Sequence, residues 1–265
     1  MALHLIDRMA VEDEGEGPAL VCVHGLGGSS NTFTPLMPAF ARHRVLRLDL
    51  PGSARSQRVE GPLSIRGFVD ALIAVCQRLG LERAHWVAHS MGSIVCQHLA
   101  VAQPKLVASL AMFGPVLAPP ESARAGLRAR AAKAREGQSG MHEIALGLVQ
   151  ASLSSDSRRR LPLAVAFVRE SLMRQEGESY ARNCEALADA QAAAVESILA
   201  PVLLVTGDED AVAPPQAVHA MAAKLHGAAS RRVVVLPRCG HWSPIERPEE
   251  CQRELRAFLT EQARN

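Results

Sequence analysis

The chain has 265 residues, of which 48% are hydrophobic and 21% charged; this balance is typical of a globular protein with a sizeable core and excludes wholesale disorder. The formal net charge of +2 gives no electrostatic reason to expect a nucleic-acid or membrane partner. No stretch approaches the ~20 continuous apolar residues of a membrane span, and residues 1–16 lack the apolar segment of a secretory signal.

The cysteines show no C-x-x-C pair and no spacing typical of a metal site, so no metal centre is expected. Because no secretory signal is found, we predict reduced thiols, several of them small core residues, in a cytoplasmic protein. These residues are Cys22, Cys76, Cys96, Cys184, Cys239 and Cys251.

Short apolar runs alternate with longer amphipathic stretches, which is typical of parallel strands joined by crossover helices. We predict buried strands at residues 19–23, 45–50, 85–88, 106–113, 201–206 and 232–236. We predict helices at residues 64–79, 90–103, 215–225 and 248–262. Together these elements predict an α/β fold with a mostly parallel central sheet flanked by helices.

A glycine-rich turn, HGLGG at residues 24–28, follows the first predicted strand. Glycines allow backbone paths closed to other residues, so the N–H of Leu26 could face a site where an oxyanion forms. Nucleotide binding is excluded, because neither G-x-G-x-x-G nor the Walker G-K-[ST] motif is present.

Residues 86–92, WVAHSMG, run from a strand through a sharp turn into a helix. The small residues Ala88 and Gly92 flank Ser90 two positions to either side, although the usual pattern has glycine at the first position. Such a turn lifts the serine hydroxyl to a helix N-terminus, where N–H groups favour negative charge, and the N–H of Met91 would be one of them. Taken alone, the motif also fits a serine that only caps a helix.

No strand is predicted between residues 115 and 199, where helical sequence rich in Ala, Leu, Arg and Glu is interrupted by Pro and Gly. Strands resume afterwards. We therefore predict a helical lid at residues 115–199, inserted late in the sheet, and a core made of residues 1–114 and 200–265. An independent helical domain is the alternative. The basic runs at residues 124–135 and 158–160 are interpreted as solvated helix faces.

Two further polar residues follow the last two predicted strands. Of the three acids at residues 208–210, Asp210 is favoured, because its G-x-x-D spacing places it past the strand end; Asp208 stays as the alternative. His241 lies in the loop after the last strand, between Gly240 and Trp242.

The order Ser90, Asp210, His241, each after a predicted strand, resembles the triad of the α/β-hydrolase superfamily, and the resemblance covers nearly the whole chain. Residues 49–56 also resemble the D-x-x-G-x-G-x-S turn of that family, with Ala54 in place of the second glycine. The resemblance implies that Ser90 is the nucleophile, that His241 is its general base and that Asp210 orients the base.

The same resemblance implies an oxyanion hole built from the N–H groups of Leu26 and Met91, and a reaction that requires no metal or organic cofactor. A serine nucleophile excludes the relatives that use an aspartate in its place. Hydrolysis of a carboxylic ester, lactone or thioester remains, together with acyl transfer and a cofactor-free peroxidase side activity. A ligand receptor or scaffold without catalysis is the alternative from another class.

The end of the predicted lid, residues 176–190, is similar to the corresponding stretch of 3-oxoadipate enol-lactonases, as are residues 198–205. This similarity implies a small-molecule ester or lactone as substrate, carrying a carboxylate that Arg182 could bind. Trp242 would narrow the pocket. The oligomeric state is open, and a homo-oligomer is compatible with the sequence.

Overall fold

An eight-stranded sheet runs through the computed structural model, which describes residues 1–56 and 60–263. Within these residues the strand order is β1-β2-β4-β3-β5-β6-β7-β8, and the pairs from β4 to β8 are parallel. The strands are β1 (Ala2–Ile6), β2 (Met9–Glu14), β3 (Ala19–Val23), β4 (Arg44–Leu48), β5 (Ala84–His89), β6 (Val107–Phe113), β7 (Val202–Gly207) and β8 (Arg231–Leu236).

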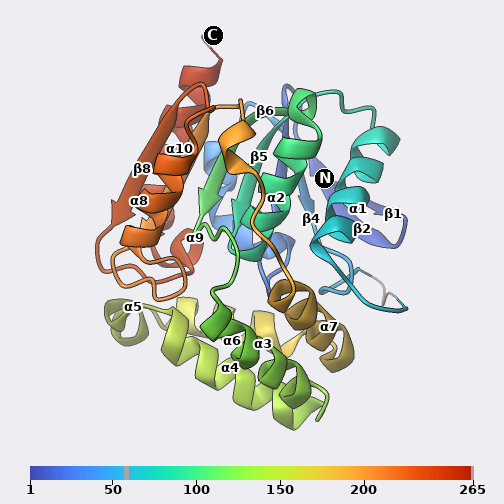
Figure 1. Cartoon of the computed structure of the whole chain (residues 1–265), viewed down its shortest axis with the longest axis vertical. Helices are drawn as coiled ribbons and strands as arrows, with labels where there is room; N and C mark the ends of the chain where they lie inside the picture. The colour runs from blue at the N-terminus through green and yellow to red at the C-terminus, as the bar shows by residue number, and fades with distance from the viewer. Residues whose placement is uncertain (57–59, 264–265) are drawn as a thin grey trace.

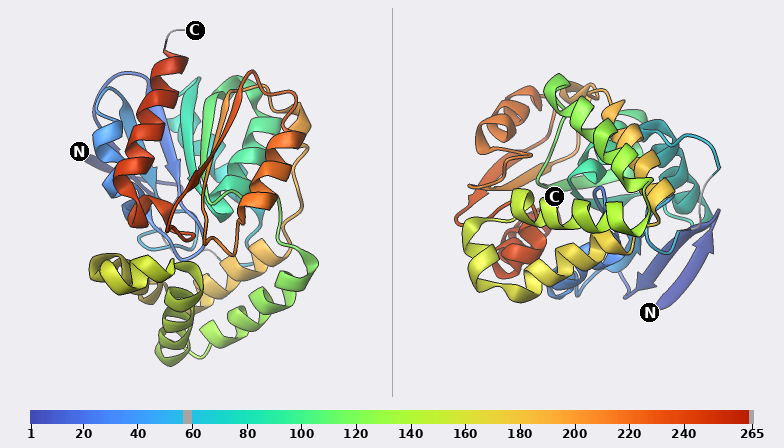
Figure 2. Two further views of the ribbon diagram at one scale, coloured as in Figure 1. Left: turned by 90° about the vertical axis from the view of Figure 1, so that its left-hand side faces the viewer. Right: turned by 90° about the horizontal axis from the view of Figure 1, so that it is seen from below.

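Helices cover both faces of this sheet (Figures 1 and 2). One face carries α1 (Ile65–Arg78), α2 (Met91–Ala102) and α8 (Pro215–Lys224); the other carries the 3-10 helix η1 (Ser30–Ala39) and α10 (Pro248–Gln262). Shorter elements are α9 (Ser243–Glu246) and the 3-10 helices η2 (Pro104–Leu106) and η3 (Val195–Ser197). The predicted α/β-hydrolase architecture, a mostly parallel sheet flanked by helices, is therefore confirmed.

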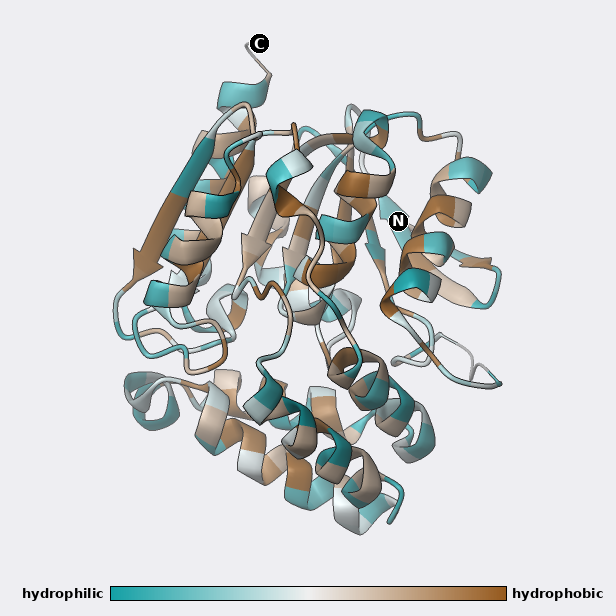
Figure 3. Cartoon of the chain, in the orientation of Figure 1, coloured by the Kyte–Doolittle hydropathy of each residue, from teal (hydrophilic) through white to brown (hydrophobic). Residues whose placement is uncertain are grey.

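The side chains of each strand alternate between the two faces of the sheet, and this explains why the core has two parts. In β3, Val21 and Val23 pack towards the α1, α2 and α8 face, whereas Leu20 and Cys22 pack towards η1 and α10. Successive side chains of a strand point to opposite faces, and a sheet covered on both faces needs apolar residues at every position. Figure 3 shows the result as brown, hydrophobic strands in the middle of the molecule.

The hairpin of β1 and β2, which pairs antiparallel with β4, was not predicted from the sequence. Its outer strand is mostly exposed, and its inner strand contains acids that interrupt the apolar pattern. These acids are paired with basic residues of β4: Arg47 lies 2.8 Å from Glu12, and Arg44 lies 2.7 Å from Asp13. The partners are separated by more than thirty residues, so no local pattern revealed the strand.

Five α-helices of the connection between β6 and β7 lie together below the carboxyl ends of the strands (Figure 1). These cap helices are α3 (Glu121–Ala134), α4 (Gln138–Ser152), α5 (Ser155–Arg160), α6 (Pro162–Met173) and α7 (Gly177–Ala188). They bury an apolar cluster of their own, to which Trp242 of the core contributes. The division into a core and a lid at residues 115 and 199 stays a prediction.

The basic residues of α3 are not only solvated. Arg135, directly after α3, pairs with Glu178 at 2.8 Å and with Glu185 at 2.7 Å, both on α7, and Arg128 of α3 pairs with Asp189 at 2.7 Å. They thus join α3 to the α7 side of the cap.

All six cysteines are buried free thiols. Burial raises the pKa of their thiols, to about 12 for Cys76 and Cys184, which keeps them protonated near neutral pH. Among the described residues, no helix is long and apolar enough to span a membrane.

Candidate active site

Ser90 lies at the junction of β5 and α2 in a strained conformation, with φ 52° and ψ −121°. A positive φ is uncommon for a residue other than glycine and is often found at functional sites. The turn requires two glycines around it. A Cβ at Gly92 would lie 2.2 Å from the carbonyl oxygen of Val23, and one at Gly25 would lie 2.6 Å from the Cβ of Ser90.

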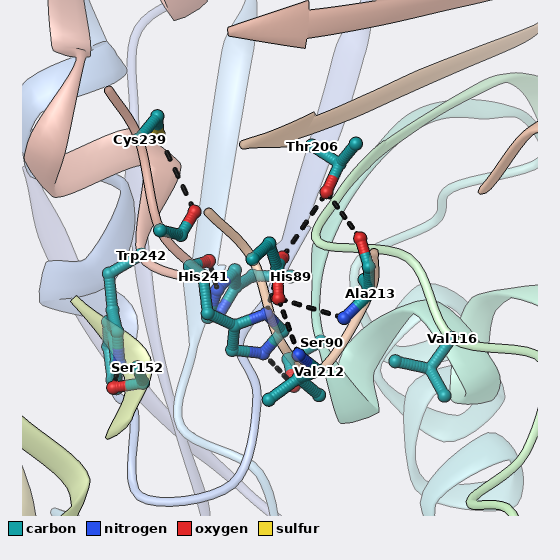
Figure 4. A network of polar contacts seen from close by, with 12 residues as sticks. His89, Ser90, Val116, Ser152, Thr206, Val212, Ala213, Cys239, His241 and Trp242 are labelled. Atoms are coloured by element: carbon teal, nitrogen blue, oxygen red, sulfur yellow. Dashed lines mark hydrogen bonds and ion pairs between the residues drawn. The ribbon is translucent and has the colours of Figure 1, made fainter. Parts of the chain in front are cut away.

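A chain of hydrogen bonds links Ser90, His241 and Asp210; Figure 4 shows Ser90 and His241 side by side. His241 Nε2 lies 2.8 Å from Ser90 Oγ, and His241 Nδ1 lies 2.8 Å from Asp210 Oδ2. The three residues are thus in hydrogen-bonding contact although 151 positions separate Ser90 from His241.

Asp210 is almost completely buried, and its other oxygen accepts the N–H groups of Val212 and Ala213, each at 2.8 Å. Burial alone would raise the pKa of this carboxyl group, but the charge and hydrogen bond of His241 and the two N–H groups outweigh burial and lower it to about 2. An ionised Asp210 accepts a hydrogen bond from the Nδ1–H of His241, which leaves Nε2 as the acceptor facing Ser90.

The neighbouring acids point elsewhere. Asp208 Oδ1 accepts the N–H of Cys239 at 3.0 Å, and Glu209 accepts the N–H of Ser155 at 2.8 Å. Of the three candidates in this turn, Asp210 is therefore the one in contact with His241, and the alternative Asp208 instead binds the loop before the histidine.

Two further histidines support the site in their neutral form. Burial, followed by the charge of His241, lowers the pKa of His89 to about 3. Neutral His89 donates from Nε2 to the carbonyl oxygen of His241 at 2.9 Å. His24, whose pKa is also lowered by burial, accepts the N–H of Leu50 at Nε2 (2.9 Å) and donates from Nδ1 to Gly25 O (2.7 Å).

Glu246 was not predicted from the sequence. Its buried carboxylate accepts the N–H groups of Gly240 at 3.0 Å and Trp242 at 3.1 Å, on either side of His241, and that of Ser154 in the cap at 2.9 Å. The N–H of His241 itself donates to the carbonyl oxygen of Ser152 at 2.7 Å. Because an acid five residues after a histidine is common in any loop, its spacing offered no usable signal.

The predicted oxyanion donors belong to Met91, which follows Ser90, and to Leu26, which follows Gly25, the glycine that approaches Ser90. Met91 is the first residue of α2, and Leu26 belongs to the glycine turn (Gly25 to Gly28), which is closed by a 3.0 Å hydrogen bond from Gly28 N to Gly25 O. Gly27 takes φ +73° in this turn, a conformation that favours glycine. The donor role of the two N–H groups stays a prediction.

The two residues predicted to bind substrate, Trp242 and Arg182, lie in different surroundings. Trp242 is buried, its ring lies 5.2 Å from that of His89, and its Nε1 donates to Ser152 Oγ at 3.1 Å. Arg182 donates from Nε to Glu178 of the same helix at 2.9 Å, so its charge is already partly compensated. Both substrate-binding roles stay predictions.

A groove of about 1240 Å³ at the amino ends of the strands is not the candidate site. It is lined by the first residues of β3 and β5 and by the end of α10, with Arg42, Arg83 and Arg256 among the lining residues. It contains none of the residues of the hydrogen-bonded chain, which lies at the carboxyl ends of the strands, where ligands bind in open α/β sheets.

A substitution at Gly114 tests how tightly the imidazole of His241 is held. A Cβ at this position, where φ is +55°, would lie 2.8 Å from both Cε1 and Nδ1 of His241. We expect Gly114→Ala to displace the ring and to lower kcat by about 100-fold, because a shift of ~1 Å is enough for such a loss. The matched control is Gly147→Ala in α4, where an added Cβ would meet nothing within 4 Å outside the backbone of its own helix. Steady-state kinetics of both variants check this, and an unchanged kcat for Gly114→Ala would contradict it.

The geometry agrees with comparisons to known proteins. Residues 18–248 match the model of the alpha/beta hydrolase fold family, and the chain belongs to that family. The (E)-2-((N-methylformamido)methylene)succinate hydrolase of Acinetobacter baylyi is 25% identical over 93% of this chain and 92% of its own length.

Solved structures of other proteins are also similar to this chain. The enol-lactonase from Burkholderia xenovorans LB400 is 26% identical, with a TM-score of 0.87, over 98% of this chain and all of that chain. A thermophilic esterase from Thermogutta terrifontis, described as malate bound, has a TM-score of 0.90 at 24% identity over 98% of both chains; this likeness concerns the fold. The resemblance inferred from the motifs is confirmed.

Proposed function

We propose that this protein hydrolyses a carboxylic ester or lactone of a small molecule through an acyl-enzyme on Ser90. The observation that carries the proposal is the hydrogen-bonded chain from Ser90 through His241 to a buried, ionised Asp210. Serine alone is a weak nucleophile and requires an adjacent base. We assign this role to His241, because its Nε2 lies 2.8 Å from Ser90 Oγ.

In the proposed reaction, His241 takes the proton of Ser90 as Oγ attacks the substrate carbonyl carbon. Asp210 stabilises the resulting imidazolium and holds its orientation. The N–H groups of Leu26 and Met91 bind the oxyanion and would contribute about 3 kcal/mol each to the transition state. His241 then protonates the leaving oxygen, and a water molecule that it activates releases the acid and restores Ser90.

The proposed substrate class is supported by the similar proteins and by the similarity of residues 176–190 to enol-lactonases. One relative is named for a substituted succinate, which carries two carboxylates, and one structural neighbour is an enol-lactonase. We therefore propose a small ester or lactone that bears a carboxylate, with 3-oxoadipate enol-lactone as the model compound. Arg182 is the proposed partner of that carboxylate.

The role of Arg182 is testable because it predicts an effect on charged substrates only. We expect Arg182→Ala to raise KM about 10-fold for an ester with a free carboxylate, the loss typical of one charge-assisted hydrogen bond, and to leave KM of a neutral ester unchanged. Arg169→Ala, which replaces another cap arginine paired with an acid of its own helix at 3.1 Å, is the matched control. If Arg182→Ala and wild type had equal KM values for every anionic ester, Arg182 would be excluded as the partner of the substrate carboxylate.

The function itself is tested by covalent labelling combined with a substrate panel. Purified protein is treated with a fluorophosphonate, digested and analysed by mass spectrometry, while short and medium p-nitrophenyl esters and a set of lactones are assayed in parallel. Labelling at Ser90 together with turnover supports the proposal, and the lactone-to-ester ratio narrows the substrate. Absence of both would favour a ligand receptor or scaffold, and product esters formed in the presence of an added alcohol would indicate an acyltransferase.

A further inference from the structure

We propose that two cap residues, Ser171 and Gln175, are positioning residues that hold the glycine turn against Ser90, so that the cap completes the oxyanion hole. This inference rests on the proposed function, because it concerns the N–H of Leu26 in that turn. It assigns the cap a part in catalysis besides covering the substrate.

Both side chains converge on one carbonyl group of the turn. Ser171 Oγ donates to Gly27 O at 2.7 Å, and Gln175 Nε2 lies 3.3 Å from the same oxygen and 3.2 Å from Gly28 O. Ser171 is 8% and Gln175 6% exposed. Polar groups buried to this extent need such partners, and here the partners are carbonyl groups of the turn, so these contacts tie the cap to the turn.

The orientation of the Gln175 amide is determined by a second partner. Its Oε1 accepts the N–H of Ala54 at 3.1 Å. Because only the amide oxygen can accept this N–H, the NH₂ group must face the carbonyl groups of Gly27 and Gly28. Gln175 therefore connects two loops of the core, the glycine turn and the turn that contains Ala54.

The glycine turn is confined from both sides. On one side the Cα of Gly25 approaches Ser90 so closely that a Cβ there would lie 2.6 Å from the serine Cβ. On the other side a Cβ at Gly27 would lie 2.4 Å from Leu172 of the cap. Leu26 lies between these two glycines, and its side chain also packs against the cap cluster. The distance from its N–H to the reacting carbonyl is thus set by the cap on one side and by Ser90 on the other.

A test compares Ser171→Ala, Gln175→Leu and the double variant with wild type, using a neutral p-nitrophenyl ester. Rates are normalised to the fraction of Ser90 labelled by the fluorophosphonate. We expect the double variant to lose about 10- to 100-fold in kcat, somewhat less than removal of an oxyanion donor itself, with KM changed less than about threefold. Affinity for a trifluoromethyl ketone, which forms an oxyanion adduct, should fall by the same factor as kcat.

The matched control is Asn183→Leu, which removes another buried amide that joins the cap to the core. Asn183 Nδ2 lies 3.3 Å from the carbonyl oxygen of Gly52 and 3.4 Å from that of Pro51, away from the glycine turn. It should lower Tm without lowering normalised kcat. Should the double variant not fold, Ser171→Ala alone decides, with an expected loss in kcat of about threefold or more.

Normalised kcat and ketone affinity equal to wild type in the double variant, or a loss confined to KM, would overturn the positioning role. The positioning role would also be overturned if Asn183→Leu lowered normalised kcat as much as the double variant does. A wild type that is neither labelled nor active would instead contradict the proposed function, so the two failures are distinguishable.

Discussion

Ser90→Ala is expected to lower kcat for a p-nitrophenyl ester by at least about 10⁴-fold, in line with the loss of a serine nucleophile in other hydrolases. The variant removes only Oγ, whose partner is His241 Nε2 at 2.8 Å. Without it no acyl-enzyme forms, and the remaining rate would come from substrate binding and the oxyanion hole. The measurement is kcat for both proteins, with a lactone panel assayed in parallel.

Folding and labelling serve as controls for this variant. Because alanine occupies less space than serine in the same turn, Tm should stay within a few degrees of wild type, and fluorophosphonate labelling should be lost. Ser122→Ala, at an exposed position of α3, should be labelled and fully active. A Ser90→Ala protein that hydrolyses esters at the wild-type rate would show that another residue is the nucleophile.

Asp210→Asn is expected to lower kcat by roughly 10³- to 10⁴-fold through the tautomer of His241. Oδ1 of Asp210 accepts two N–H groups, from Val212 and Ala213. The amide oxygen of asparagine must take that position, which turns its NH₂ group towards His241 Nδ1. Nδ1 must then accept, the proton moves to Nε2, and the imidazole can no longer take the proton of Ser90.

Asp208→Asn is the matched control for this prediction. Asp208 accepts the N–H of Cys239 through one oxygen, a contact that an asparagine oxygen can keep, so kcat should stay within about threefold of wild type. Kinetics of the two variants therefore decide between the two acids that the sequence left as candidates. An equal loss in both, or a larger one in Asp208→Asn, would contradict the assignment of Asp210.

The cap contacts each of the three loops around the site. Ser171 and Gln175 bind the glycine turn, Ser155 binds Glu209 beside Asp210, and the backbone of Ser152 accepts the N–H of His241. In the positioning role proposed above, such contacts hold the loops of the site in place. This arrangement differs from a lid that only shields the substrate from water.

Several features of this protein could be predicted from the sequence because their requirements are local. Six strands of the sheet were found within two residues of their observed ends, since each is a short apolar run between turn signals. The turn around Ser90 was recognisable because a sharp bend between strand and helix tolerates only small neighbours such as Gly92. The order of Ser90, Asp210 and His241, each after a strand, then indicated the fold family.

The remaining features depend on residues far apart in the chain, which leave no local pattern. The hairpin of β1 and β2 is held by ion pairs to β4, and Glu246 and Gln175 bind backbone groups of loops 92 and 147 positions away. The G-x-x-D spacing favoured Asp210 over Asp208, but only the tertiary structure showed that Asp210 is the acid in contact with His241, since Asp208 accepts the N–H of Cys239 instead. It also decided where the cap meets the sheet, since polar contacts between buried side chains and carbonyl groups form only after both parts have folded.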